Sequence, residues 1–247
     1  MDDTLPIQAL VALTFLFAGL VKGLIGLGLP TVAIGLLSLV MMPVQAAALL
    51  VVPSLVTNVW QLAAGPRFRP LVRRLWPMML AICAGTWAGA GILTGYGGGL
   101  VKAGLGAALV CYAVLGLTAV RIAVPDRAEP WLSPVIGALT GLVTGATGVF
   151  VIPAVPYLQA LGLEKDELVQ ALGLSFTVST VALAAALARD GALGLSAGAS
   201  LLTLVPAIGG MLLGQYARRR IEARVFRLYF FWGLLALGGH LILQGAL

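Results

Sequence analysis

The stretch Gly19-Leu-Val-Lys-Gly-Leu-Ile-Gly26 returns later in the chain as Gly141-Leu-Val-Thr-Gly-Ala-Thr-Gly148. The two copies agree at five of eight positions, with an offset of 122 residues. A proline follows each copy, Pro30 after the first and Pro153 after the second. Self-similarity at a fixed offset is the signature of an internal repeat. These stretches therefore predict a chain built from two related halves.

Further matches follow in the same order along the chain. Asn58 corresponds to Thr180 at the same offset, and Leu75-x-Pro77 corresponds to Leu204-x-Pro206 at an offset of 129. Low sequence complexity is the alternative explanation, because Gly, Ala, Leu and Val make up much of the chain, but two blocks in the same order argue against it. We expect a first repeat at 1–122, a linker at 123–130 and a second repeat at 131–247.

The composition places both halves in a membrane. Sixty per cent of the 247 residues are apolar, only 10% are charged, and the mean hydropathy is +1.05. Soluble domains are about 45–50% apolar and about 25% charged. The charge-dense stretches are short enough to be loops, which leaves no room for a catalytic module outside the membrane. The sequence predicts an all-α polytopic membrane protein with about 8 to 10 membrane segments.

Ten apolar segments separated by loop-like residues account for this number. Acidic residues precede the first segment, which favours a membrane segment over a cleavable signal peptide. The second and seventh segments are shorter than the roughly 20 residues that span a bilayer, and each follows a Gly-rich stretch, so they predict half-helices or re-entrant hairpins. The segments run over 5–29, 31–42, 44–65, 71–94, 98–122, 131–150, 151–163, 167–188, 193–216 and 225–245.

The distribution of Lys and Arg indicates the orientation. Loop 66–74 contains four arginines and loop 217–227 contains five, whereas 94–98 and 189–193 are nearly uncharged. Short cytoplasmic loops are enriched in Lys and Arg. Corresponding loops of the two repeats then lie on opposite sides of the membrane, which predicts inverted-topology repeats. We expect both termini outside the cytoplasm and the linker inside.

Several function classes are excluded by what the chain lacks. Cys83 and Cys111 lie within apolar segments and indicate neither a disulfide framework nor a metal site. His240 is the single histidine and has no partner motif for catalysis, and there is no Gly-Lys-Ser/Thr motif for a nucleotide. The arginine clusters flank hydrophobic spans without interleaved aromatic residues, which argues against nucleic acid. We expect no enzyme, no cofactor and no metal site.

Inverted repeats with broken helices at equivalent positions are the usual plan of a secondary carrier, whose binding site lies near the bilayer midplane. The expected breaks lie within 19–30 and 141–156. Glycines let the backbone unwind, and N–H groups at the start of a half-helix can bind an anion. The alternative explanation is that small residues only allow helices to pack closely.

Lys22 is the only formal charge between Asp3 and Arg67, and it lies inside the first Gly-rich block. A cation in a membrane is costly unless it is paired, and its own segment offers no carboxylate. Lys22 therefore either extends to the cytoplasmic interface or faces an anionic ligand. Thr144 is its equivalent in the second half, so the expected site is asymmetric in charge.

Hydroxyl and amide side chains form the next candidate set, in the segment after each short helix. They can donate several hydrogen bonds to an oxyanion without carrying a fixed charge. Their alternative role is hydrogen bonding within or between helices, which is common in membranes. The set comprises Ser54, Thr57, Asn58 and Gln61 in the first half and Ser175, Thr177, Ser179 and Thr180 in the second.

The acidic residues constrain how transport is coupled. All nine fall in the N-terminal tail, in loops or near segment ends. A proton relay through a membrane protein depends on an Asp or Glu within the spans. We therefore expect no such relay, whereas sodium bound to unwound backbone carbonyls and uncoupled passage of an anion both stay open.

The block Gly19 to Pro30, repeated at Gly141 to Pro153 and followed each time by a helix with Ser or Thr, resembles the sulfite exporter TauE/SafE family of permeases. That family is also named for toluene sulfonate uptake. The resemblance spans nearly the whole chain. Members typically carry three consecutive glycines in this block, whereas the chain has Gly26-Leu-Gly28 and Gly148-Val-Phe, so the departure leaves the substrate open.

The resemblance implies a prokaryotic inner-membrane permease that moves a small sulfur-containing anion, such as sulfite or an organosulfonate, by alternating access between the repeats. Backbone N–H groups near Gly26 to Gly28 and Gly148 to Val149 are expected to bind the anion. The expected partners are this anion and membrane lipid, with no nucleic acid, and a homo-oligomer stays open. The candidate site residues are Lys22, Gly26, Gly28, Thr57, Asn58, Thr144, Thr147, Gly148, Ser175 and Ser179.

Two other functions stay open. One is a channel or carrier for another small carboxylate-type anion, which would use the same hydrogen-bond donors. The other is a membrane assembly or sensor subunit without flux.

Overall fold

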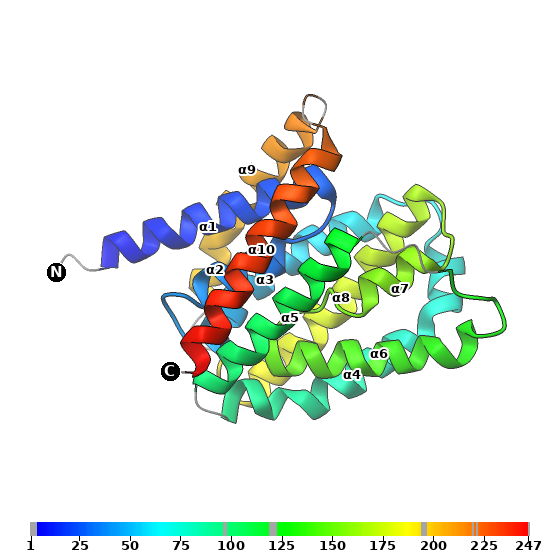
Figure 1. Ribbon diagram of the computed structural model, residues 1–247, viewed down its shortest axis with the longest axis horizontal. Helices are drawn as coiled ribbons and strands as arrows, with labels where there is room; N and C mark the ends of the chain where they lie inside the picture. Colours follow the sequence, from blue (N-terminus) through cyan, green and yellow to red (C-terminus); the bar gives the residue numbers. More distant parts are fainter. Residues whose placement is uncertain are drawn as a thin grey trace.

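The computed structural model describes residues 4–95, 98–118, 123–193, 197–218, 220 and 222–246. This part of the chain forms ten α-helices joined by turns, which confirms the predicted all-α class (Figure 1). Each helix coincides with one of the ten predicted apolar segments. In chain order the helices are α1 (Thr4–Ile25), α2 (Leu29–Leu37), α3 (Pro43–Ala63), α4 (Phe68–Gly95), α5 (Gly98–Thr118), α6 (Glu129–Thr147), α7 (Ala154–Ala160), α8 (Lys165–Arg189), α9 (Ala197–Ala217) and α10 (Ala223–Ala246).

Seven of these helices, α1, α3, α4, α5, α8, α9 and α10, are long and apolar enough to cross a membrane. The chain is therefore a polytopic membrane protein, as predicted. Its outer surface fits this environment, because aromatic side chains gather at membrane interfaces. All five tryptophans, Trp60, Trp76, Trp87, Trp131 and Trp232, are 53 to 61% exposed.

Glycine ends α1 and proline starts α2 at the first predicted break. Gly26 has a φ of 77° and Gly28 a φ of 102°, a left-handed conformation that other residues avoid. They end α1 at Ile25, earlier than the predicted end of the segment at Leu29. Pro30 lies in the first turn of α2, where its missing N–H costs no helical hydrogen bond.

The second break has the same design. Gly148, with a φ of 75°, ends α6, and Pro153 immediately precedes α7. The helices that follow the two breaks have nine and seven residues, too few to span a bilayer. The predicted short helices are thus confirmed at both positions.

Glycines bring α1 and α9 into backbone contact. A Cβ on Gly210 of α9 would lie 1.9 Å from the carbonyl oxygen of Leu16, and one on Gly19 would lie 2.1 Å from the carbonyl oxygen of Ala207. Small residues spaced four apart allow this approach between membrane helices. Gly23 and Gly214 extend the same contact by one turn, so α1 and α9 run parallel.

Helices α4 and α6 form the corresponding interface. A Cβ on Gly85 would lie 2.3 Å from the carbonyl oxygen of Ala138, and one on Gly141 would lie 2.3 Å from that of Ile82. Each interface joins one helix from before the linker to one from after it. The two parts of the chain are therefore interlocked and do not form separate bodies.

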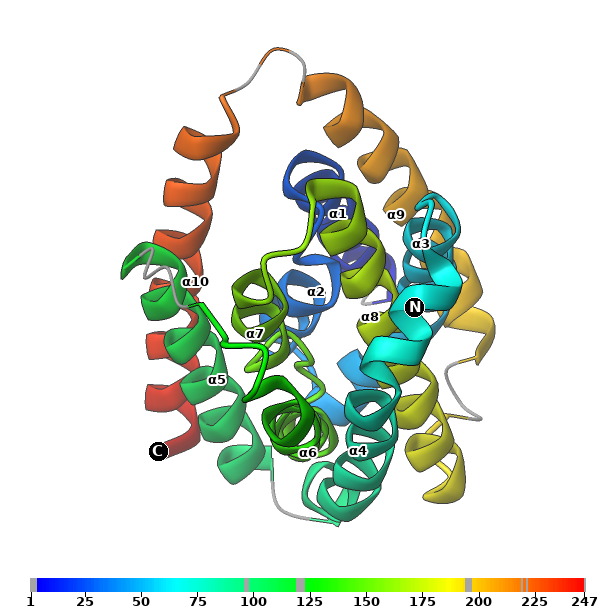
Figure 2. The same cartoon turned by 90° about the vertical axis from the view of Figure 1, so that its right-hand side faces the viewer.

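Two further helix pairs run antiparallel. Gly99 and Gly106 of α5 lie against Gly245 and Gly238 of α10, respectively. Helices α3 and α8 also pack together, with hydrogen bonds that link the end of α3 to the start of α8. Figure 2 shows the short helices α2 and α7 inside a ring of longer ones. Fully buried Phe15, Phe150 and Phe176 belong to this core.

Candidate functional site

Lys22 begins a polar chain that crosses three helices. It lies in the last turn of α1 and is only 5% exposed, and its Nζ donates a hydrogen bond to Oδ1 of Asn58 on α3. Asn58 Nδ2 donates to Oγ1 of Thr180 on α8 at 3.2 Å. Thr180 Oγ1 donates in turn to the carbonyl oxygen of Phe176 at 2.7 Å. The structure thus brings Lys22 and Asn58 together, as a shared site requires.

The charge of Lys22 has no acidic partner in the described part of the chain. The ion pairs recorded there are Arg67–Glu167 and Arg74–Glu129, both at helix ends. Each of the seven carboxylate residues described is partly or fully exposed, so the predicted lack of a carboxylate deep in a span holds for them. Asp2 and Asp3 lie outside the described residues. A buried cation held only by a neutral amide is a favourable place for an anion.

Asn58 and Thr180 are the positions that the sequence offset of 122 equates. Their direct hydrogen bond places the polar chain where the two halves of the sequence face each other. Thr180 belongs to the predicted polar set but not to the ten candidate residues. Its correspondence to Asn58 is the signal that could have identified it.

Three candidate threonines use their hydroxyl protons within their own helices. Thr57 donates to the carbonyl oxygen of Pro53, Thr144 to that of Thr140, and Thr147 to that of Val143, each at 2.7 Å. Such bonds to the residue four positions earlier are the alternative role expected for membrane threonines. In this conformation these hydroxyls are not available as donors to a ligand.

Ser175 and Ser179 of α8 differ from these threonines. Both are fully buried, and neither hydroxyl has a hydrogen-bond partner in the described structure. They lie four residues apart and so share one face of α8. Ser54 of α3 and Thr31 of α2 are likewise buried and unpartnered. Thr31 is not among the predicted polar residues, which belong to the segments after the two short helices.

The backbone donors at the two breaks are partly occupied. The N–H of Gly26 donates to the carbonyl oxygen of Lys22 at 2.8 Å, and the N–H of Gly148 donates to that of Thr144 at 2.8 Å. The N–H of Val149 donates to Thr147 Oγ1 at 3.2 Å. Both breaks keep free donors, because the N–H groups of Leu27, Gly28 and Leu29 at the first and of Phe150 and Val151 at the second have no partner among the described residues.

The candidate residues form two groups in space. Lys22 and Asn58 lie together, and the first break follows directly after Lys22. A Cβ on Gly148 would lie 2.3 Å from Ile34 and 3.5 Å from Ala47 of α3. Ala47 precedes Asn58 by roughly 16 Å of helix at 1.5 Å per residue. Gly148 and Thr147 are therefore displaced from the Lys22 group along α3.

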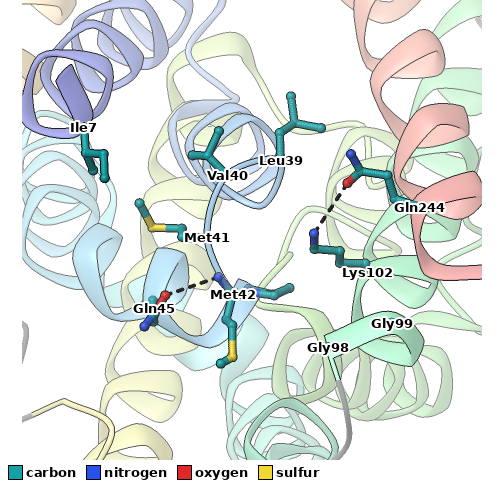
Figure 3. Close-up of a pocket in the computed structure, with 11 residues that line it drawn as sticks. Ile7, Leu39, Val40, Met41, Met42, Gln45, Gly98, Gly99, Lys102 and Gln244 are labelled. Carbon is teal, nitrogen blue, oxygen red and sulfur yellow. Dashed lines mark hydrogen bonds between the residues drawn. The ribbon is translucent and has the colours of Figure 1, made fainter. Parts of the chain in front are cut away.

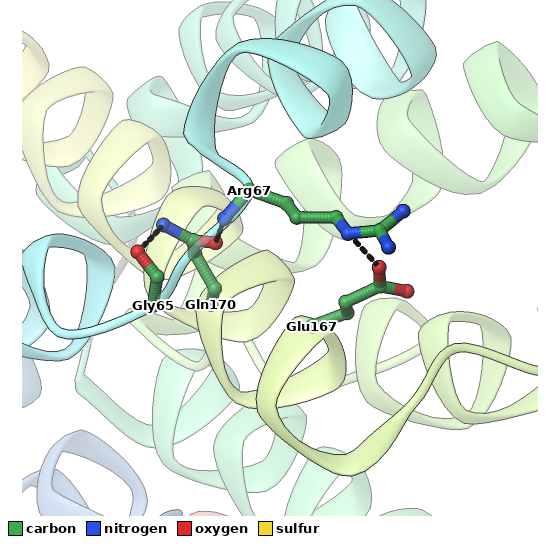
Figure 4. A network of polar contacts seen from close by, with 4 residues as sticks. All are labelled: Gly65, Arg67, Glu167 and Gln170. Atoms are coloured by element: carbon green, nitrogen blue, oxygen red, sulfur yellow. Dashed lines mark hydrogen bonds and ion pairs between the residues drawn. The ribbon is translucent and has the colours of Figure 1, made fainter.

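A second polar cluster joins the end of α3 to the start of α8 and is named here the Gln170 network (Gly65, Arg67, Glu167 and Gln170; Figure 4). Gln170 Nε2 donates to the carbonyl oxygens of Gly65 at 2.8 Å and Leu62 at 2.9 Å. Its Oε1 accepts from the N–H of Arg67 at 2.8 Å. The Arg67 guanidinium pairs with Glu167 at 3.0 Å. This network closes one end of the α3–α8 interface.

Comparison with protein-family models finds a match to the family described as sulfite exporter TauE/SafE, over residues 11–241. The match includes every candidate residue and both breaks. No curated protein and no solved structure matches the chain.

Proposed function

Because the chain belongs to the sulfite exporter TauE/SafE family, we propose that it is a secondary permease that moves sulfite or an organosulfonate by alternating access. Family membership alone makes it a multi-pass membrane transporter for sulfur-containing anions and not an enzyme. The narrower proposal concerns the substrate, the residues that bind it and the motion that carries it.

The buried amino group of Lys22, hydrogen-bonded to Asn58, is the observation that carries this proposal. An ammonium group has three N–H donors, and the described residues supply Lys22 with one side-chain acceptor, Asn58 Oδ1. A sulfite or sulfonate oxygen would occupy a second donor and supply the missing negative charge. Hydrogen bonds between ionised partners are roughly twice as strong as neutral ones.

The surrounding residues would complete the site. Asn58 orients Lys22, and Thr180 fixes the Asn58 amide so that its oxygen faces the cation. The free hydroxyls of Ser175 and Ser179 and the free N–H groups of Leu27 to Leu29 are further donors. Thr57, Gly26 and Gly28 would act through the backbone that they shape. Thr144, Thr147 and Gly148 belong to the second break, which is displaced from Lys22 along α3.

Two inverted halves, 1–122 and 131–247, would supply the moving parts. Helix α1 of the first half contacts α9 of the second, and the corresponding helices α6 and α4 contact each other in the same way. This exchange of partners supports a two-fold relation between the halves. The antiparallel pairs α5–α10 and α3–α8 support an axis in the membrane plane, since an axis along the membrane normal would make such pairs parallel. Rocking of one half against the other would expose the site alternately to each side.

The orientation follows from the loop charges. Arg67, Arg69, Arg73 and Arg74 lie at the turn between α3 and α4, which we assign to the cytoplasm of a prokaryotic cell. Ile7 near the start of α1 and Gln244 near the end of α10 line one cavity at the other end, which supports two extracytoplasmic termini. The Gln170 network then closes the cytoplasmic side, so this conformation would be open to the outside.

Uptake of radiolabelled sulfite into liposomes tests the proposal. Lys22→Gln removes the charge and leaves a polar side chain that is one atom shorter, and it should lower uptake at least about tenfold, as loss of a buried charged partner typically does. Lys22→Arg should retain part of the activity. Lys165→Gln is the matched control, because Lys165 is exposed at the start of α8.

The outcomes separate the remaining alternatives. Uptake by Lys22→Gln equal to that of Lys165→Gln would exclude Lys22 from the binding site. Inhibition of uptake by acetate as strongly as by methanesulfonate would favour a carrier for carboxylate-type anions. Uptake by the unaltered protein no greater than that of empty liposomes would favour an assembly or sensor subunit.

A further inference from the structure

A cavity of about 730 Å³ lies at the end of the molecule opposite the Gln170 network (Figure 3). It is bounded by the turn between α2 and α3, the start of α5, the end of α10 and the start of α1. Ile7 and Val40 on its rim are more than half exposed, so the cavity opens to the surroundings. None of the ten candidate residues lines it, which makes it separate from the Lys22 site.

Among the residues that the structure describes, Lys102 is the only charged one that lines this cavity. Its Nζ donates to Oε1 of Gln244 at 3.4 Å, a long contact that leaves most of its donor capacity unused. No carboxylate lies within 4.0 Å of Lys102 in the described structure. Lys102 is partly buried, so its charge is less screened by water than that of a fully exposed lysine.

The neighbours of Lys102 fix the polar end of the cavity. Because Lys102 can only donate, Gln244 must present its oxygen to it and its Nε2 to His240 Nε2, 3.1 Å away. The close approach of Gly99 to Gly245 holds α5 and α10 together at this point. Gly98 and Gly99 open α5 and line the cavity, so free N–H groups of the first turn lie beside the Lys102 cation.

The opposite wall is mainly apolar, with Gln45 as its polar side chain. Figure 3 shows Ile7 and Met41 across the cavity from Lys102 and Gln244, with Val40 and Leu39 between the two sides. A volume of about 730 Å³ falls in the range of small-molecule sites, about 300–1,000 Å³. A cavity with one cationic end and an apolar wall suits an anion that has an apolar body, and a small inorganic oxyanion would leave most of the wall without a contact.

We propose that this cavity is an outer binding site for an organic anion with an apolar body, whose oxyanion group binds Lys102 and the start of α5. The site would collect the anion before it passes to Lys22. That second step rests on the proposed function, whereas binding at Lys102 does not. The ends of spanning helices lie at the depth of lipid headgroups, so an anionic headgroup shares this chemistry, and the phosphatidylglycerol arm of the experiment below distinguishes the two sources.

Binding of benzenesulfonate to the purified full-length protein tests the site. The protein is placed in nanodiscs of zwitterionic phosphatidylcholine, and Lys22→Gln serves as the background so that the central site contributes little. Adding Lys102→Gln should raise the dissociation constant at least about tenfold, the effect of losing one hydrogen bond to a charged group. Adding Lys102→Arg or Lys165→Gln should change the dissociation constant by no more than about threefold, because both variants keep a cation at position 102. Inorganic sulfite should bind this background more weakly than benzenesulfonate.

Three results would overturn the proposal. The first is the same affinity in the Lys102→Gln and Lys165→Gln variants, and the second is no saturable binding of benzenesulfonate by the Lys22→Gln background. The third is loss of binding when phosphatidylglycerol replaces part of the phosphatidylcholine, which would assign the cavity to a lipid headgroup. Sulfite uptake by Lys22→Gln reads out the proposed function independently, so either idea can fail alone.

Discussion

Gln170 on α8 fits against Gly65 only because Gly65 has no side chain. Its Nε2 donates to the carbonyl oxygen of Gly65 at 2.8 Å, and a Cβ on Gly65 would lie 2.4 Å from Gln170 Cδ. The α3–α4 turn and the first turns of α8 are therefore matched to each other in shape as well as in hydrogen bonding.

Gly65→Ala should destabilise the protein. The added methyl group displaces Gln170 from its carbonyl partners, and overpacking of this kind typically costs about 1–3 kcal/mol. Thermal unfolding in detergent measures the change. Gly91→Ala is the control, because a Cβ on Gly91 meets nothing within 4 Å. Equal unfolding temperatures for the two variants would contradict the assigned contact.

Gln170→Ala should cost more stability than Glu167→Gln. The first change removes three hydrogen bonds of a side chain that is 1% exposed, a loss of about 2–4 kcal/mol at roughly 1 kcal/mol each. The second removes an ion pair whose Arg67 side chain is 62% exposed, and such pairs contribute about 0–1 kcal/mol. Denaturant unfolding of both variants tests this order. The reverse order would show that the Arg67–Glu167 ion pair contributes more to stability than the hydrogen bonds of Gln170.

Asn58→Asp should strongly reduce anion transport without unfolding the protein. The new carboxylate would face Lys22 at nearly unchanged shape and would take the place of the substrate charge. Sulfite uptake should fall by roughly tenfold or more, equivalent to about 1.4 kcal/mol. Thr180→Ser, which keeps the acceptor for Asn58 Nδ2, is the matched control. Full uptake by Asn58→Asp would show that the substrate does not use the charge of Lys22.

Gly210→Ala and Gly209→Ala should differ sharply although the residues are neighbours. A Cβ on Gly210 would lie 1.9 Å from the backbone of Leu16, whereas one on Gly209 would lie 4.0 Å from Leu16 Cδ1. We expect a loss of about 1–3 kcal/mol for Gly210→Ala and at most a few tenths for Gly209→Ala. Folded yield and thermal unfolding measure the difference, and a loss of equal size for both would refute the α1–α9 contact.

The elements of this fold could be predicted because lipid imposes long apolar helices and because Gly and Pro end them. The segment predicted to end at Leu29 stops at Ile25, since the sequence does not state which glycine of the block takes a positive φ. The pairing of α1 with α9 could not be predicted. Small residues four apart occur in several helices, and their pattern does not identify the partner.

The candidate site was predicted in part. Lys22 and Asn58 were chosen for charge and polarity, and the structure places them in contact. Periodicity could not distinguish Ser175, whose hydroxyl is free, from Thr144, whose hydroxyl bonds to its own helix, since the rotamer decides between these roles. The sequence could not place Lys102 in a cavity, because the cavity is formed by four segments that are distant along the chain.

The pairing of α1 with α9 also sets the order in which the protein can be assembled. Leu16 can contact Gly210 only after about 190 further residues have been synthesised. At 5–20 residues per second this synthesis takes roughly 10–40 s. During that time the ribosome has delivered the first helix to the membrane while its closest partner does not yet exist. The newly inserted α1, with Lys22 in its last turn, therefore meets α2 and Asn58 of α3 before α9 can cover its glycine face.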